Sequence, residues 1–142
     1  MKRFVVMCAA IFCVLATTAL ADDAAEKAAI KKTLEDHYFA GLANNDPDLL
    51  GKVFHTSSHL QTVQGNGKVW DKPSVEWRKG FDPTKKATKY ECEVADIRLA
   101  GNVASVTTVL ESDKVKYIDY LNMMKIEGKW MIVSKIFHTI RK

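Results

Sequence analysis

A chain of 142 residues is long enough for one globular domain, and its 47% content of hydrophobic residues is sufficient for a real core. Its 21 Lys and Arg residues nearly balance 17 Asp and Glu residues, for a formal charge of +4. This balance argues against a dedicated nucleic-acid-binding protein, which would carry a strongly basic face.

The N-terminus has the pattern of an export signal. Lys2 and Arg3 precede an apolar run over residues 4–15, and a small-x-small pattern ends at Ala21. We therefore predict a signal peptide over residues 1–21, cleavage after Ala21, and a periplasmic or secreted protein. A membrane anchor is the alternative, but the apolar run is too short to span a bilayer, so no membrane association is expected after cleavage.

Cleavage would also change the cysteine count and the charge. It would remove Cys8 and Cys13, which leaves Cys92 with no partner for an intrachain disulfide. It would lower the formal charge from +4 to +2, because Lys2 and Arg3 are lost. At a strand position, Cys92 is interpreted as a small buried hydrophobic residue rather than a nucleophile.

Three helices are expected in the first half of the remaining chain. Apolar residues recur every four positions over residues 24–43, which is typical of a long amphipathic helix with one buried stripe. Asp46 followed by Pro47 predicts an N-cap and a second, short helix that ends near His55. A third helix is expected from Ser74 to about Lys79.

Strands are expected before the third helix and throughout the second half. The segment 59–64 alternates as a strand, and a glycine turn at 65–67 leads into a short return strand. From Ala87 onward the pattern predicts four strands with turns at 101–102, 113–114 and 127–128. The domain, residues 22–142, is thus predicted to be α+β.

The side chains of the four-strand meander can be assigned to two faces, because side chains alternate along a strand and short turns fix the register. One face is dominantly apolar, and we expect the helices to cover it. It collects Ala95, Ile97, Leu99, Ala104, Val106, Thr108, Leu110, Tyr117, Asp119, Leu121, Met123, Trp130, Ile132, Ser134, Ile136 and His138.

The opposite face mixes apolar and polar side chains and is too apolar for a bare solvent surface. It collects Tyr90, Cys92, Val94, Asp96, Arg98, Ser105, Thr107, Val109, Tyr120, Asn122, Met124, Met131, Val133, Lys135 and Phe137. We predict a homodimer through this outer sheet face. A partly exposed sheet in a monomer is the alternative.

Asp119 is the most informative single residue, because an ionisable group on an apolar face must be paired, neutralised or used. The expected register places Asp119 opposite Ile136 and diagonal to His138, which lies across from Tyr117. A carboxylate beside an imidazole is the minimum for acid–base catalysis and also for a structural ion pair. Both interpretations remain open.

Metal binding is not predicted. His37, His55, His59 and His138 have no diagnostic ligand spacing, and no carboxylate joins them in a motif. No cofactor is expected either. Tyr38 belongs to the buried stripe of the first helix, although its hydroxyl group could face a cavity.

Two motifs carry a family resemblance that covers nearly all of residues 22–142. Asp119-Tyr120-Leu121 is followed by Gly128-Lys129-Trp130-x-Ile132-Val133-x-Lys135, and Phe54-His55 and Gly101-Asn102 also fit. This pattern resembles the nuclear transport factor 2-like superfamily, in the branch named putative lumazine-binding and related to polyketide cyclase-like proteins. The resemblance implies a cone in which a curved antiparallel sheet wraps around three N-terminal helices, with a pocket at its open end and a common dimeric state. The same cone serves isomerases, dehydratases, cyclases and proteins without catalysis.

Three functional hypotheses follow. The first is an exported protein that holds a small, partly apolar molecule in the cone. The second is an acid–base enzyme of isomerase, dehydratase or cyclase type, with Asp119 as general base and Tyr38 or His138 stabilising the developing oxyanion. The third is a protein-interaction module with a filled core. The expected ligand-binding residues are Tyr38, His55, Tyr117, Asp119, Trp130 and His138.

Overall fold

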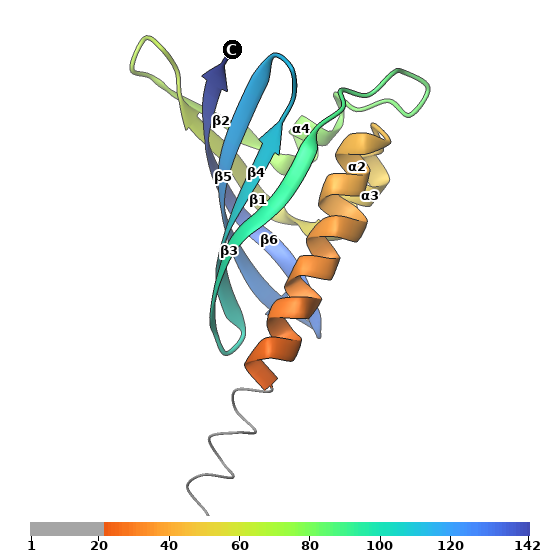
Figure 1. Ribbon diagram of the computed structural model, residues 1–142, viewed down its shortest axis with the longest axis vertical. Coiled ribbons are helices and arrows are strands. Elements are labelled where there is room, and N and C mark those ends of the chain that lie inside the picture. The colour runs from red at the N-terminus through yellow and green to blue at the C-terminus, as the bar shows by residue number, and fades with distance from the viewer. Residues whose placement is uncertain (1–21) are drawn as a thin grey trace, which may run out of the picture.

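The computed structural model describes residues 22–142, which form a long helix packed across the concave face of one curved six-stranded sheet (Figure 1). The strand order is β2-β1-β6-β5-β4-β3. All neighbours are antiparallel except β1 and β6, which run parallel. The predicted α+β fold is confirmed, whereas the predicted signal peptide lies outside the described residues.

The first helix is continuous but not uniform. Residues 22–33 are α-helical, Leu34–Phe39 form a π-helical segment (η1), and Ala40–Ala43 return to α-helix (α2). The predicted apolar stripe is buried at Ile30, Leu34 and Tyr38. A π-helical segment inserts an extra residue per turn and often occurs at functional sites. The position of Tyr38 within η1 therefore agrees with a functional role for this residue.

The second helix, α3 (Pro47–Val53), begins at the predicted cap. The Asp46 side chain accepts hydrogen bonds from the backbone N–H groups of Asp48 at 2.8 Å and Leu49 at 3.1 Å. A Cβ atom on Gly41 would lie 2.8 Å from the Leu50 side chain. Glycine at this position therefore lets α2 and α3 pack closely.

The first hairpin starts earlier than the sequence suggests. β1 spans Phe54–Val63 and pairs with β2 (Val69–Pro73), and α4 (Ser74–Arg78) follows directly. The prediction that Phe54 belongs to the second helix is wrong, because Phe54 is extended and pairs with Ile132 of β6. Its ring is buried against the rings of Tyr38 and Trp77.

The second half of the chain is the predicted meander of β3 (Glu91–Ala100), β4 (Val103–Glu111), β5 (Val115–Ile126) and β6 (Lys129–Arg141). Its turns fall where they were expected. At the β5–β6 turn, Glu127 and Gly128 have φ angles of 49° and 77°. Two successive positive φ angles define the tight turn that suits the twist of a hairpin.

Two β-bulges change the predicted faces of the sheet. In β3, Val94 pairs with Thr108 and Asp96 with Thr107, so Ala95 is an extra residue. In β6, Ile132 pairs with Met123 and Ser134 with Asn122, so Val133 is an extra residue. Each bulge moves one part of its strand to the opposite face.

As a result, the predicted faces are wrong for the start of β3, before Ala95, and for the end of β6, after Val133. Cys92 and Val94 pack against the core rather than belonging to the outer face. Lys135 is buried and Phe137 is half-buried on the concave side, whereas Ile136 and His138 are exposed on the outside. The predicted pairing of Asp119 with Ile136 is wrong: Asp119 lies opposite Phe137, and His138 lies opposite Ile118.

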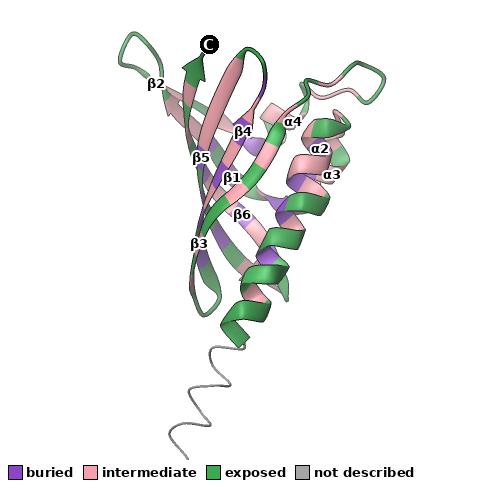
Figure 2. Ribbon diagram, viewed as in Figure 1, coloured by how far each residue is buried: buried purple, intermediate pink, exposed green. Residues whose placement is uncertain are grey.

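The core lies between the long helix and the concave face of the sheet, where the buried residues of Figure 2 gather. Its largest fully buried members include Tyr38, Phe54, Leu121 and Ile132. Within residues 22–142, no helix has both the length and the apolar character needed to cross a membrane.

Candidate functional site

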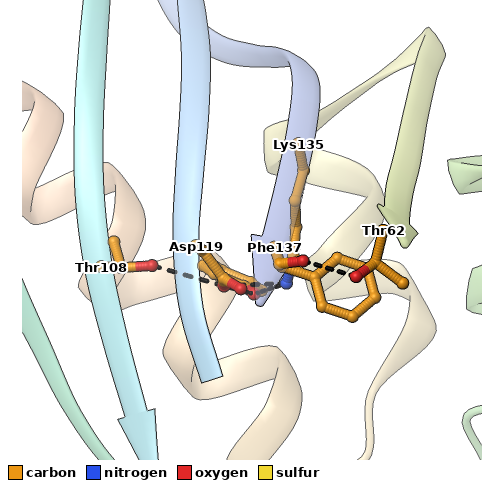
Figure 3. Close-up of polar contacts among 6 residues, drawn as sticks. Thr62, Thr108, Asp119, Lys135 and Phe137 are labelled. Carbon is orange, nitrogen blue, oxygen red and sulfur yellow. Dashed lines mark hydrogen bonds and ion pairs between the residues drawn. The ribbon is translucent and has the colours of Figure 1, made fainter. Parts of the chain in front are cut away.

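A buried charged group lies at the centre of the concave face. Asp119 has no exposed surface, and its Oδ2 atom accepts hydrogen bonds from the Tyr38 hydroxyl at 2.6 Å and from Lys135 Nζ at 2.8 Å. The Thr108 hydroxyl lies 3.4 Å from the same oxygen. Figure 3 shows Thr108, Asp119 and Lys135 converging from β4, β5 and β6. We refer to Asp119, Lys135 and Tyr38 as the buried triad.

Lys135 is the member of this group that sequence reasoning missed. Its Nζ atom also donates to the Tyr38 oxygen at 2.5 Å, and its side chain is 7% exposed. The ammonium lies 5.1 Å from the ring centroids of both Tyr38 and Phe137, so aromatic faces stabilise its charge as well. Lys135 is the single charged residue between Met131 and Phe137, and that isolation was the available signal.

Burial perturbs both proton-carrying partners of Asp119. Loss of solvation lowers the pKa of the Lys135 ammonium below its ordinary value, and the adjacent carboxylate opposes this shift. Burial raises the pKa of the Tyr38 hydroxyl well above its usual range, and the Asp119 charge adds to the rise. Tyr38 therefore stays protonated at neutral pH and acts as a hydrogen-bond donor.

A pocket of about 320 Å³ lies directly beside the triad. Its walls are mainly aromatic, and Lys135 Nζ and the Tyr38 hydroxyl belong to side chains that line it. Asp119 is not a lining residue and lies behind these two. The aromatic lining residues are Tyr38, Trp70, Trp77, Phe81, Tyr90, Tyr117 and Phe137.

The walls are held by contacts between elements far apart in the chain. Trp70 of β2 and Phe137 of β6 pack edge to face, with their ring centroids 5.9 Å apart. The ring centroids of Phe137 and Tyr117 of β5 are 6.1 Å apart. Thr62 of β1 donates a hydrogen bond of 2.6 Å to the backbone carbonyl of Phe137, as Figure 3 shows. Such contacts give the pocket its shape without a ligand.

The structure brings together three of the predicted site residues. Tyr38 and Tyr117 line the pocket, and Asp119 contacts Tyr38. It does not bring His138 to this place, since the bulge at Val133 turns His138 to the outer face. The predicted carboxylate–imidazole pair is therefore replaced by a carboxylate–ammonium pair.

The two remaining predicted residues lie elsewhere. The His55 ring is 2.7 Å from the Ser57 hydroxyl at the start of β1. Trp130 is buried beside the first turns of the long helix, where its Nε1 donates to Glu26 at 2.8 Å. Neither residue lines the aromatic pocket.

Cys92 is half-buried and close to the triad. Burial raises its pKa to about 11, and the Asp119 charge contributes to the rise. It therefore stays a thiol at neutral pH, which fits the interpretation of Cys92 as a small apolar residue. Among residues 22–142, no group of three His, Cys, Asp or Glu side chains is arranged to hold a metal ion.

The geometry offers a definite chemistry. A substrate oxygen in the pocket would meet the Lys135 ammonium, which keeps one N–H beyond those that it donates to Asp119 and Tyr38. The carboxylate behind it can accept a proton from this ammonium.

Comparisons with known proteins agree with this architecture. The family model described as Putative lumazine-binding matches residues 25–138. A crystal structure of a nuclear transport factor 2-like protein of unknown function from Shewanella baltica superposes with a TM-score of 0.75 and 25% identity, covering 84% of this chain and 97% of that one. A "Putative Scytalone Dehydratase" from Novosphingobium aromaticivorans has the same fold, with a TM-score of 0.64, 17% identity, and coverage of 83% and 86%.

One curated protein gives a partial match. "Aldolase FrzH" of Cladobotryum sp is 38% identical over 61 residues, which are 42% of this chain and 49% of that protein. The match therefore spans about half the length of each of the two proteins.

Proposed function

Because the chain belongs to the Putative lumazine-binding family, whose model covers residues 25–138, we propose that it binds a small, partly apolar molecule with a carbonyl oxygen in its aromatic pocket. The observation that carries this proposal is the Lys135 ammonium, which donates to Tyr38 and lines a pocket with mainly aromatic walls. An apolar cavity with a few convergent polar groups is the usual form of a small-molecule site.

The site residues of the proposal follow from the pocket. Lys135 would donate to the ligand oxygen, and Tyr38 would hold the Lys135 ammonium in position. Trp70, Trp77 and Tyr117 would contact the apolar part of the ligand. Asp119 would act through Lys135 and Tyr38 rather than by direct contact, because it lies behind them. The pocket also weighs against the third hypothesis, a filled core.

Binding can be tested with lumazine, whose flat ring system and ring carbonyls suit such a pocket. We expect saturable quenching of tryptophan fluorescence, since Trp70 and Trp77 line the walls. Leu42→Trp should fill the pocket and weaken binding at least about tenfold. The matched control is Val69→Trp, at a position on β2 that is 65% exposed and outside the aromatic pocket. Equal binding by both variants would contradict the site.

An acid–base enzyme is a second candidate. One observation favours it: Asp119 Oδ2 contacts both proton donors of the pocket, while its Oδ1 atom has no hydrogen-bond partner among the described residues. The partial match to a protein named as an aldolase points toward carbonyl substrates as well. Exchange of the α-protons of a ketone such as cyclohexanone in D₂O, followed by NMR, tests it. An exchange rate equal to that of buffer would refute catalysis.

We further propose that the protein is exported and acts as a homodimer. Export is supported by the signal-like pattern that ends at Ala21. The mass of protein recovered from the periplasm of a bacterial host would show whether the mature chain starts at Asp22. The dimer is supported by apolar side chains on the outer sheet face, and its test is given in the Discussion.

A further inference from the structure

We propose that Lys135 forms an iminium with the carbonyl carbon of a small aldehyde or ketone in the aromatic pocket, so that the protein is an amine catalyst of carbonyl compounds. The proposal rests on the proposed function, because the carbonyl must first enter the pocket. It goes further by making Lys135 a nucleophile rather than a hydrogen-bond donor.

The position of Lys135 supports this role. Its side chain emerges from β6 into a space lined by Trp77, Tyr38 and Phe137, and 7% of it remains exposed. An amine attacks only in its neutral form, and a buried lysine loses its proton more readily than an exposed one. The lowered pKa of Lys135 agrees with this requirement.

The neighbours of Lys135 can manage the protons of the reaction. Asp119 Oδ2, at 2.8 Å, accepts one proton from the ammonium and leaves a free electron pair on nitrogen. That pair attacks the carbonyl carbon to form the C–N bond, and the C=O π electrons move to oxygen. Tyr38, which contacts both Lys135 and Asp119, passes a proton from nitrogen to this oxygen and gives a carbinolamine.

The second half of the reaction restores the triad. The proton held by Asp119 is returned through Tyr38 to the hydroxyl group, the C–O bond breaks, and water leaves as the nitrogen pair forms the C=N bond. The net change is ammonium plus carbonyl to iminium plus water, with no gain or loss of protons. The regenerated carboxylate then faces the cationic iminium, which acts as an electron sink for the adjacent carbon.

Buried lysine–carboxylate pairs are also found as purely structural pairs, and two features distinguish this one. Lys135 lines the pocket instead of being sealed beneath it. It also lies next to a phenol that is itself bonded to the carboxylate, so a complete proton path reaches the reacting nitrogen.

Reductive trapping tests the proposal. The full-length protein is incubated with benzaldehyde and sodium cyanoborohydride at pH 7, and adducts are located by peptide mass spectrometry. We expect one benzyl group per chain on Lys135, at aldehyde concentrations that leave exposed lysines unlabelled. Lys135→Arg should lose this adduct, whereas the matched control Lys125→Arg should retain it. Tyr38→Phe should slow trapping by at least about tenfold.

The outcomes separate the two proposals. Quenching by benzaldehyde without an adduct on Lys135 would overturn the iminium and leave the binding site intact. Absence of both would overturn the binding site too. If Lys135→Arg fails to fold, competition on the unmodified protein decides: benzyl alcohol should protect Lys135, and labelling of Lys135 that ignores this competitor would contradict reaction in the pocket.

Discussion

At the scale of single residues, the protein is dominated by one ion pair that is removed from water. Asp119 is fully buried and Lys135 nearly so, and each is the nearest opposite charge of the other. Burial of two charges is costly, and their attraction offsets this cost only when hydrogen bonds complete the pair. Tyr38 and Thr108 supply such bonds to Oδ2, while Oδ1 has no hydrogen-bond partner within residues 22–142.

The ion pair predicts a specific pattern of stability. Asp119→Asn leaves the Lys135 ammonium buried without its counter-charge, and it should lower the free energy of unfolding by about 3–5 kcal/mol. The double variant Asp119→Asn with Lys135→Met should recover most of this loss, because no unpaired charge remains. Urea unfolding at pH 7 measures both.

The single variant Lys135→Met provides the control, because it leaves the carboxylate unpaired instead. A free energy of unfolding for Asp119→Asn within about 1 kcal/mol of the unmodified protein would contradict strong coupling in the pair. That result would support a functional rather than a structural role for the Asp119 carboxyl group.

At the scale of elements, three local irregularities create the site. The π-helical segment Leu34–Phe39 carries Tyr38, and the bulge at Val133 carries Lys135 and Phe137 to the concave face. The bulge at Ala95 does the same for Cys92 and Val94. Without the bulge at Val133, the long stretch of alternation in β6 would present His138 to the helix and Lys135 to solvent.

The β5–β6 turn fixes where the alternation of β6 begins. Two substitutions in this turn should change the free energy of unfolding in opposite directions. Glu127 adopts a φ of 49°, which asparagine tolerates better, so Glu127→Asn should raise the free energy of unfolding by roughly 0.5 kcal/mol. Gly128→Ala should lower the free energy of unfolding by about 1 kcal/mol, because Gly128 has a φ of 77°. The space around Gly128 is open, so the added Cβ atom causes no clash and the cost comes from the backbone conformation alone. Thermal unfolding measures both.

The matched control is Glu127→Gln, which changes the charge but keeps an ordinary side chain in the left-handed region. We expect it to leave stability unchanged. A gain equal to that of Glu127→Asn would mean that charge, not backbone conformation, governs this turn.

At the scale of the whole molecule, the two faces of the sheet have different roles. The concave face holds the core, the triad and the pocket. The outer face exposes apolar side chains on adjacent strands: Tyr120 and Ile136 lie opposite each other across β5 and β6, and each is 51% exposed. Val103 and Met124 pair across β4 and β5 farther along the same face, and each is 43% exposed. Exposed apolar side chains on one sheet face are typical of a protein interface.

A second copy of the chain is the partner that we propose for this face. Ile136→Lys should convert the dimer to a monomer, because a charge would be buried at the centre of the interface. Analytical ultracentrifugation measures the change. Ala28→Lys, which adds the same charge on the exposed side of the long helix, should leave the dimer intact. A monomeric unmodified protein would contradict the interface.

The amino-acid sequence by itself determined the α+β fold, the three helices, the turns of the meander, and the inward positions of Tyr38, Tyr117 and Asp119. Periodicity is a local property of the chain, so these features needed no knowledge of their neighbours. Only the tertiary structure decided that Lys135, and not His138, meets Asp119. One extra residue at Val133 reverses every later side chain of β6, and hydropathy could not locate it because both faces would receive one polar and one apolar residue.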